Sequence, residues 1–408
     1  MKPAQAVPAT YDGREQAYVK HVLLESYLET LVMIIGQSGG ARKRGEVEIT
    51  FVDCFAGPWQ SDDAELSGTS ISLSLRILAA CKAKLARKGI ATKMRALYVE
   101  KHPEAFSRLD AFLGRQDQQV VETACLEGDF LDLRQAILDW CGTKAFCFFF
   151  IDPKGFKEIG VTQLSPLLKR RRSEFLINFM YMFVNRVASM EEQKSVMRQL
   201  LGGEVDLTGL DPDERERRIL SLYRAGLLGE MREACGADFP PRSAYARVLD
   251  VSKARVKYHL VYATSHPLGI VRFMEASEGA EQVQQTVRDY VHFESREQAA
   301  LIQDMFAEEE RVPQAAARAA AEEIDRFWLR YLKDEGRRVD LGAFASILEA
   351  QDFFPGELQA SLGGLICRNM VVNEDAKRKR TMHHLHYEDA ERLHITPAGL
   401  AELVRLER

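Results

Sequence analysis

The chain lacks the features of a secreted, membrane-spanning or zinc-binding protein. Its seven cysteines are scattered, with no C-x-x-C pair and no Cys/His spacing of the kind that holds zinc. Cys54, Cys147 and Cys367 lie within apolar runs and are expected to be buried thiols. There is no apolar signal-peptide core near the start, and no apolar run reaches the roughly 20 residues that span a bilayer. These absences predict a cytoplasmic protein with no membrane contact and no structural metal.

The chain also lacks a large excess of charge of either sign. A formal net charge of −5 excludes nucleic-acid binding through overall positive charge, so any phosphate contact needs a local basic patch. Apolar residues make up 46% and charged residues 28%, as in soluble globular proteins. A length of 408 residues predicts two or three domains.

Strand-like apolar runs alternate with helical patterns after the first 45 residues. An amphipathic helix is predicted for residues 15–35 and a glycine-rich basic loop for residues 36–45. The predicted strands are "EVEITFVD", "MRALYVE", "QVVETACLEGDF" (which includes the loop after the strand), "AFCFFFID" and "SEFLINFM". Nearly continuous apolar strands separated by helices predict a parallel sheet covered on both faces. The later stretch "KYHLVYATSHPLGIVRFMEA" predicts two more strands, joined by a tight turn at an antiparallel edge.

The remaining composition predicts an α/β protein with further domains. The division expected is an N-terminal helix and loop (1–45), a Rossmann-like domain (46–276) with a helical insertion (about 190–239), a helical linker (277–334) and a winged-helix domain (335–408). The last assignment rests on two short helices, a hairpin tip rich in Lys and Arg, and a closing strand, turn and helix.

Acidic residues follow the predicted strands in register. Asp53 precedes the turn Phe55-Ala56-Gly57, Glu100 ends the second strand and Asp129 follows the third. In an open α/β sheet, ligands bind beyond the carboxyl ends of the strands. A carboxylate at the end of the second strand can accept hydrogen bonds from ribose hydroxyls, and the carboxylate of Asp129 can accept one from the exocyclic amine of adenine. Three acids repel pyrophosphate and favour the positively charged S-adenosylmethionine, although each acid alone also fits a capped turn.

The fourth strand ends in a candidate reaction centre. Asp152-Pro153 places a side-chain oxygen and a backbone carbonyl where they can accept hydrogen bonds from a target amine, and Phe156 can stack on a base. Such contacts position the amine for methyl transfer. The same residues equally fit a strand-ending turn with Phe156 in the core.

A set of short motifs resembles one protein family. The motifs are "KHVLLESYL", "FVDCFAGP", "GTSISL", "YVEKHPEAFSRL", "GDF", "FFFIDPKGF", "LINF" and "YATSHPLG". Together they resemble the three-Cys-motif partner (TcmP) family, over residues 13–276. The resemblance implies a class I, Rossmann-like methyltransferase. It also implies a partner protein with cysteine motifs like those of iron–sulfur radical enzymes.

The resemblance assigns roles to individual positions. Asp53, Ala56 and Gly57 match the cofactor turn, Glu100 the ribose acid, Asp129 the adenine contact, and Asp152, Pro153 and Phe156 the reaction-centre motif. Two positions depart from the family pattern: Trp59 replaces a glycine and Lys154 an aromatic residue.

Two basic features lie outside these strand ends. Lys20 and His21 match the family, but a pair on the helix surface is the favoured interpretation. The basic run at the predicted wing, Lys377, Arg378, Lys379 and Arg380, favours contact with a nucleic-acid backbone over a solvated loop.

The predicted function is therefore S-adenosylmethionine-dependent methylation of nucleic acid, DNA or RNA, at an exocyclic base amine. The alternative is a degenerate methyltransferase fold that serves as a recognition subunit for the cysteine-motif partner, and Trp59 and Lys154 keep this alternative open.

Overall fold

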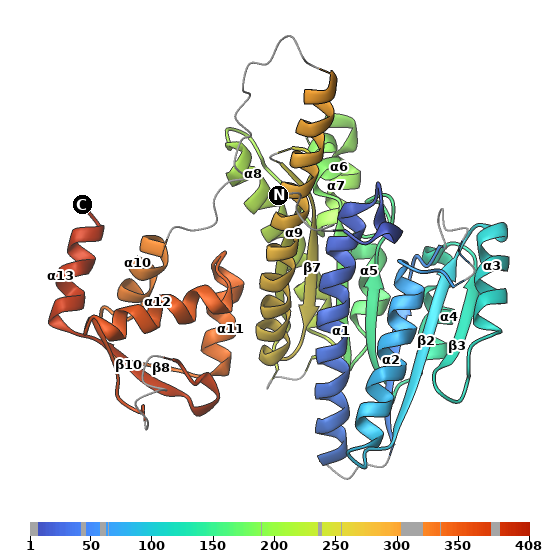
Figure 1. Ribbon diagram of the computed structural model, residues 1–408, viewed down its shortest axis with the longest axis horizontal. Coiled ribbons are helices and arrows are strands. Elements are labelled where there is room, and N and C mark those ends of the chain that lie inside the picture. Colours follow the sequence, from blue (N-terminus) through green and yellow to red (C-terminus); the bar gives the residue numbers. More distant parts are fainter. Residues whose placement is uncertain are drawn as a thin grey trace. The chain divides into compact units, whose positions relative to one another are not determined.

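Seven strands form one sheet in the computed structural model (Figure 1). The structure describes residues 7–41, 46–57, 63, 65–188, 190–235, 239–253, 255–302, 321–334, 336–376 and 384–408. Two units are distinguished below. Unit 1 comprises Met1–Ser265 and Ala280–Glu309, and unit 2 comprises His266–Gly279 and Glu310–Arg408.

The sheet of unit 1 has the strand order β3-β2-β1-β4-β5-β7-β6. Its strands are β1 (Val47–Asp53), β2 (Thr92–Glu100), β3 (Glu122–Glu127), β4 (Phe146–Ile151), β5 (Ser173–Phe179), β6 (Arg242–Leu249) and β7 (Val256–Thr264). The first five are parallel, while β7 runs antiparallel to both β5 and β6. This order, with an antiparallel β7, is that of Rossmann-like class I methyltransferases, so the predicted fold class is confirmed.

Helices cover both faces of this sheet. They are α1 (Glu15–Ala41), α2 (Ser70–Ala86), α3 (Pro103–Leu113), α4 (Phe130–Cys141), α5 (Val161–Leu168), α6 (Tyr181–Val187), α7 (Lys194–Leu201) and α8 (Pro212–Met231). Helix α9 (Pro267–Ile302) belongs to unit 1 only from Ala280 onward. Helices α1 and α2 pack on each other and on β1, whereas α5 packs against α4, α7 and α8.

The apolar strands are buried on both faces because successive side chains point to opposite sides. Phe148 of β4 contacts Tyr27 of α1, with ring centroids 5.8 Å apart. Its neighbour Phe149 stacks on Phe175 of β5 at 5.2 Å, within the core cluster to which α4, α5, α7 and α8 contribute.

Helix α1 is longer than predicted, because the glycine-rich stretch from residue 36 onward continues the helix to Ala41. Packing explains this. A Cβ atom on Gly36 or Gly39 would lie 2.5 Å from Leu85 or Val47, respectively. These glycines let α1 approach its neighbours closely, and that contact offsets their poor helix propensity.

The predicted pair of strands in "KYHLVYATSHPLGIVRFMEA" is wrong in its second half. The first part is β7, but Pro267 begins helix α9, a position where its missing N–H costs nothing. The antiparallel partner of β7 is instead β6, which precedes it.

Unit 2 contains a small antiparallel sheet and short helices. Its remaining elements are α10 (Ala321–Tyr331), β8 (Arg337–Val339), α11 (Leu341–Ala350), α12 (Pro355–Cys367), β9 (Val371–Asn373), β10 (Glu391–Ile395) and α13 (Pro397–Leu406). The sheet order is β8-β10-β9. Trp328 of α10 is fully buried, and its indole N–H donates to the carbonyl of Leu358 at 3.0 Å. The winged-helix assignment stays a prediction, since residues 377–383 lie outside the described residues.

Two expectations from composition can be compared with the structure. Cys54 and Cys147 are buried as predicted, but Cys367 is exposed because it ends α12 on the solvent side. In the described part of the chain, no helix has both the length and the apolarity to cross a bilayer.

Candidate active site at the carboxyl ends of the strands

Asp53 is a buried acid that holds the turn after β1. It is 1% exposed and accepts hydrogen bonds from Phe55 N–H at 3.1 Å and from the Ser70 hydroxyl at 2.6 Å. Burial raises the pKa of its carboxyl to about 7, and the charge of Asp152 contributes to that rise. Both oxygens are occupied within the protein, so its carboxylate shapes the turn.

The turn itself is tied to the neighbouring strands. Ala56 N–H donates to the carbonyl of Val99 on β2 at 2.8 Å, and Gly57 N–H donates to Phe55 at 3.0 Å. Ala56 is buried and Gly57 is half-buried. These bonds bring the backbone of the predicted cofactor turn against the end of β2, next to Glu100.

Glu100 and Asp129 each keep one carboxylate oxygen open. Glu100 Oε1 accepts from His102 N–H at 2.7 Å, and Asp129 Oδ1 caps α4 by accepting from Leu131 N–H at 2.9 Å. The hydrogen bonds that these two side chains accept from described residues go to Glu100 Oε1 and Asp129 Oδ1, and none goes to Glu100 Oε2 or Asp129 Oδ2. The two strand ends are joined, because Gly128 N–H donates to the carbonyl of Glu100 at 3.0 Å.

Asp152 lies between a lysine and an asparagine. Its Oδ2 forms an ion pair with the ammonium of Lys20 on α1, and its Oδ1 accepts from Asn178 Nδ2 on β5 at 2.6 Å. The side chains of Lys20 and Asp152 are only 12% and 19% exposed. Lys20 also lies 6.0 Å from the ring centroid of Phe150. Asn178 is buried, and its Oδ1 has no hydrogen-bond donor among the described residues.

The interpretation of Lys20 and His21 as a surface pair is therefore wrong. His21 is 7% exposed, and its Nδ1 lies 2.9 Å from the Tyr11 hydroxyl. Burial, reinforced by the charge of Lys20, lowers the pKa of His21 to about 3. An amphipathic pattern shows which face of α1 is buried, but it cannot show that this face meets the end of β4.

Lys20 and Asn178 are thus the residues that the sequence interpretation missed. Both belong to motifs that carry the family resemblance, "KHVLLESYL" and "LINF", which was the available signal. Their convergence on Asp152 depends on α1 crossing the sheet and on β5 pairing with β4.

The rest of the Asp-Pro motif has mixed exposure. Pro153 is buried, Lys154 is exposed, and Phe156 is half-buried against the core cluster. Trp59 and the basic run Lys377, Arg378, Lys379 and Arg380 lie outside the described residues.

No protein-family model matches the chain, and no curated protein sequence matches it. Similar solved structures include a candidate methyltransferase from Porphyromonas gingivalis W83, at TM-score 0.25 and 10% identity, which covers 56% of this chain and 40% of that one. Protein LPL1258 from Legionella pneumophila str. Philadelphia 1 has TM-score 0.33 and 12% identity, over 67% of this chain and 92% of that one. A candidate O-methyltransferase from Klebsiella pneumoniae has TM-score 0.28 and 11% identity, over 61% and 90%.

These likenesses are too distant to carry an argument about activity. The strand order defines the class: unit 1 is a Rossmann-like sheet of the class I methyltransferase type. The hydrogen-bond acceptors at its carboxyl edge fit an adenosyl ligand, because Glu100 and Asp129 each present an oxygen that accepts from no described residue.

Proposed function

We propose that the chain is an S-adenosylmethionine-dependent methyltransferase that acts on an exocyclic amine of a nucleic-acid base. The observation that supports this proposal best is the shared edge of the sheet. Glu100 and Asp129 present open carboxylate oxygens there, and Asp152 is held by Lys20 and Asn178. The resemblance of the motifs to the TcmP family supports the same class.

In this proposal the strand-end acids hold the cofactor. When bound, S-adenosylmethionine supplies a methyl group on a positively charged sulfur. Glu100 accepts from the ribose hydroxyls and Asp129 from the adenine amine, using the oxygens that no described residue occupies. Asp53 keeps the turn through Ala56 and Gly57 in place, so that the backbone can approach the cofactor.

Asp152 and Pro153 orient the target amine. The Asp152 carboxylate and the Pro153 carbonyl accept its two N–H groups, which directs the nitrogen lone pair away from them. Lys20 and Asn178 fix the carboxylate from two sides, so the acceptor is placed before the amine arrives. Such positioning contributes a large part of catalysis in this kind of reaction.

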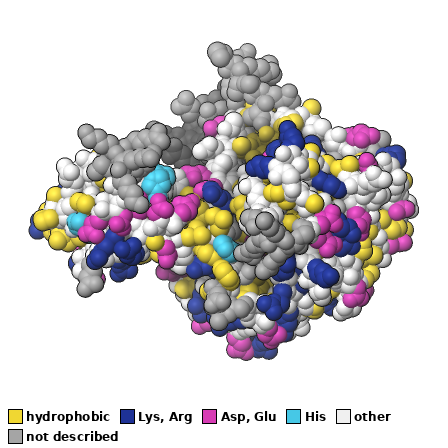
Figure 2. Space-filling view, turned by 90° about the horizontal axis from the view of Figure 1, so that it is seen from below, with side chains coloured by type: hydrophobic (Ala, Val, Ile, Leu, Met, Phe, Trp, Pro, Cys, Tyr) yellow, Lys and Arg dark blue, Asp and Glu magenta, His cyan; other side chains and the backbone are white. Residues whose placement is uncertain are grey.

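The nucleic-acid part of the proposal rests on local features. On the face shown in Figure 2, basic and acidic side chains of the described residues are interspersed, so a phosphate backbone needs a confined basic patch. The run from Lys377 to Arg380 supplies four positive charges in sequence. Changing all four to glutamine should weaken binding and flatten its salt dependence, because fewer counterions are released.

Calorimetry and a labelled-methyl assay test the enzyme. We expect the native chain to bind S-adenosylhomocysteine and to transfer labelled methyl groups to DNA or RNA. Glu100→Ala should weaken cofactor binding, and Asp152→Ala should abolish transfer while binding remains, because alanine offers the amine no acceptor. Glu104→Ala, an exposed acid on α3, is the matched control. Absence of cofactor binding at high micromolar concentrations, with folded protein, would overturn the proposal.

One observation favours the alternative, a recognition subunit for a cysteine-motif iron–sulfur partner protein. Both oxygens of Asp152 are already engaged within the protein, as in a purely structural acid. In that case Asp53→Ala and Asp152→Ala chains keep full biological activity alongside the partner. Loss of activity in both variants, with folding intact, excludes the alternative.

A further inference from the structure

Unit 2 contains a cavity of about 670 Å³ that lies outside the site described above. It is lined by Glu322, Glu323, Arg326, Phe327, Arg330, Tyr331, Gln351 and Phe353. Six of these residues lie along the solvent-facing side of α10, while the opposite side of that helix buries Ile324, Trp328 and Leu329. The volume falls within the range of pockets that hold small ligands.

Aromatic rings form one wall of the cavity. Phe327 stacks on Tyr331 with centroids 5.7 Å apart and meets Phe353 edge-on at 5.4 Å. The exposed guanidinium of Arg337, on β8, lies over the Tyr331 ring at 4.6 Å from its centroid. A guanidinium plane on an aromatic ring is a flat surface on which a nucleobase can stack.

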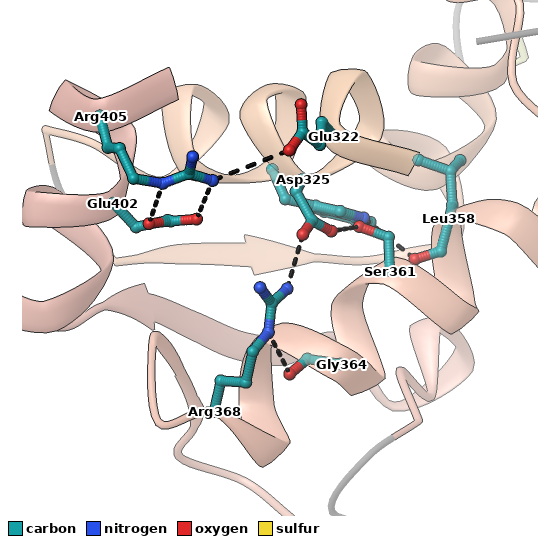
Figure 3. Close-up of polar contacts among 9 residues, drawn as sticks. Glu322, Asp325, Leu358, Ser361, Gly364, Arg368, Glu402 and Arg405 are labelled. Carbon is teal, nitrogen blue, oxygen red and sulfur yellow. Dashed lines mark hydrogen bonds and ion pairs between the residues drawn. The ribbon is translucent and has the colours of Figure 1, made fainter. Parts of the chain in front are cut away.

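Two acids near the cavity, outside its lining, are already paired with other side chains. Figure 3 shows Asp325 turned toward α12, where it binds Ser361 and Arg368. Glu402 accepts hydrogen bonds from Nε and Nη2 of Arg405, each at 2.8 Å. These two carboxylates are therefore not available to pair with the arginines at the cavity.

Two arginines, in contrast, have no acidic partner among the described residues. Arg326 lines the cavity with a buried Nε that lacks an acceptor there, and Arg337 is likewise without an ion pair. Arg330 is paired with Glu407 at 2.9 Å. Two acids also line the cavity: Glu322 lies 3.8 Å from Arg405, and Glu323 has no described partner. The unpaired groups are therefore Arg326 in the lining, Arg337 beside it over Tyr331, and the Glu323 carboxylate as a hydrogen-bond acceptor.

We propose that this cavity binds an unstacked nucleotide of single-stranded nucleic acid. The base stacks on the Tyr331–Arg337 surface, Arg326 and Arg337 hold phosphate oxygens, and the Glu323 carboxylate accepts from an exocyclic base amine. Cytosine offers this carboxylate an exocyclic amine, whereas thymine has only its ring N3–H as a donor, so the cavity prefers cytosine to thymine. The proposal shares a nucleic-acid partner with the proposed function but requires neither cofactor nor methyl transfer.

Fluorescence anisotropy with labelled dC12 and dT12, on the full chain without cofactor, tests the site. We expect tighter binding of dC12, and a loss of at least about fivefold in Tyr331→Leu, the effect of one lost stacking contact. The Arg326→Gln, Arg337→Gln double variant should lower the salt slope by about 0.7 for each lost phosphate contact. Arg392→Gln, an arginine of the same unit that is 50% exposed and does not line the cavity, should bind like the native chain.

Competition with cytidine monophosphate identifies the source of the nucleotide. If cytidine monophosphate displaces dC12 only at concentrations far above the dC12 dissociation constant, the cavity binds a nucleotide within a strand. If the two ligands bind with equal affinity, the cavity is a site for a free nucleotide. Native binding in all cavity variants, with thermal unfolding unchanged, would overturn the proposal. Undetectable binding of both oligonucleotides would also overturn it, whereas the methyltransferase proposal would stand on its own cofactor-binding test.

Discussion

At the scale of single residues, Lys20 controls how Asp152 is presented. Lys20→Met keeps most of the side chain's length but removes the ammonium that pairs with Asp152. The carboxylate then rests on Asn178 alone and is free to rotate. Since misplacement by about 1 Å can cost about 100-fold in rate, we expect a loss of that order in labelled-methyl transfer.

Cofactor affinity separates this role from general damage to the fold. Lys20→Met should bind S-adenosylhomocysteine nearly as well as the native chain in calorimetry, because Glu100 and Asp129 are untouched. Lys84→Met is the matched control, since Lys84 also pairs with an acid, Glu29, but is 43% exposed and lies on α2. Equal methyl transfer in both variants would show that the Lys20–Asp152 pair has no catalytic importance.

Asp53 makes stability depend on pH. Its folded pKa of about 7 lies above the value of about 3.9 for an unfolded aspartate, so the folded chain binds the extra proton between these pH values. Stability therefore falls as pH rises from about 4 to 7, by an amount on the order of a few kcal/mol. Asp53→Asn removes this penalty, and its single amide oxygen replaces one of the two acceptors, for Phe55 N–H or for the Ser70 hydroxyl, a loss that is the same at every pH.

Urea unfolding of both chains at pH 5 and pH 8 measures the effect. The free energy of unfolding of Asp53→Asn, relative to the native chain, should be higher at pH 8 than at pH 5. Other titrating groups are common to both chains and cancel in this comparison. A difference that is the same at both pH values would mean that Asp53 is ionised throughout.

At the scale of the elements, the glycines of α1 lower its helix propensity but allow it to pack closely against its neighbours. Gly39→Ala gains up to about 1 kcal/mol of helix propensity but places a Cβ 2.5 Å from the branched side chain of Val47. Overpacking typically costs about 1–3 kcal/mol, so we expect net destabilisation in urea unfolding. Gly229→Ala is the control, because no atom lies within 4 Å of its Cβ and α8 should gain stability. The packing explanation would be wrong if both variants were stabilised.

The same glycines show what the sequence could predict. Strand identity and the order of the strand-end acids follow from local patterns, so Asp53, Glu100, Asp129 and Asp152 could be predicted to share one edge. The length of α1 could not, because its glycines are explained only by the side chains they meet. The contact of Lys20 with Asp152 is equally non-local, joining residues 132 positions apart.

At the scale of the whole molecule, the two units should respond separately to the cofactor. The proposed cofactor residues all belong to unit 1, whereas Trp328 is fully buried in unit 2. The chain has three tryptophans, so Trp59→Phe, Trp140→Phe protein reports on unit 2 through Trp328 fluorescence. A ligand that binds only unit 1 stabilises that unit by about 2.7 kcal/mol at 100 times its dissociation constant.

Thermal unfolding of this double variant, followed by circular dichroism and by Trp328 fluorescence, checks the expectation. S-adenosylhomocysteine should raise the midpoint of a transition seen by circular dichroism and leave the Trp328 midpoint unchanged. Helix α9 is the element that could couple the units, because it contributes Pro267–Gly279 to unit 2 and its remaining residues to unit 1. Equal shifts of both midpoints would show instead that the chain unfolds as one cooperative structure.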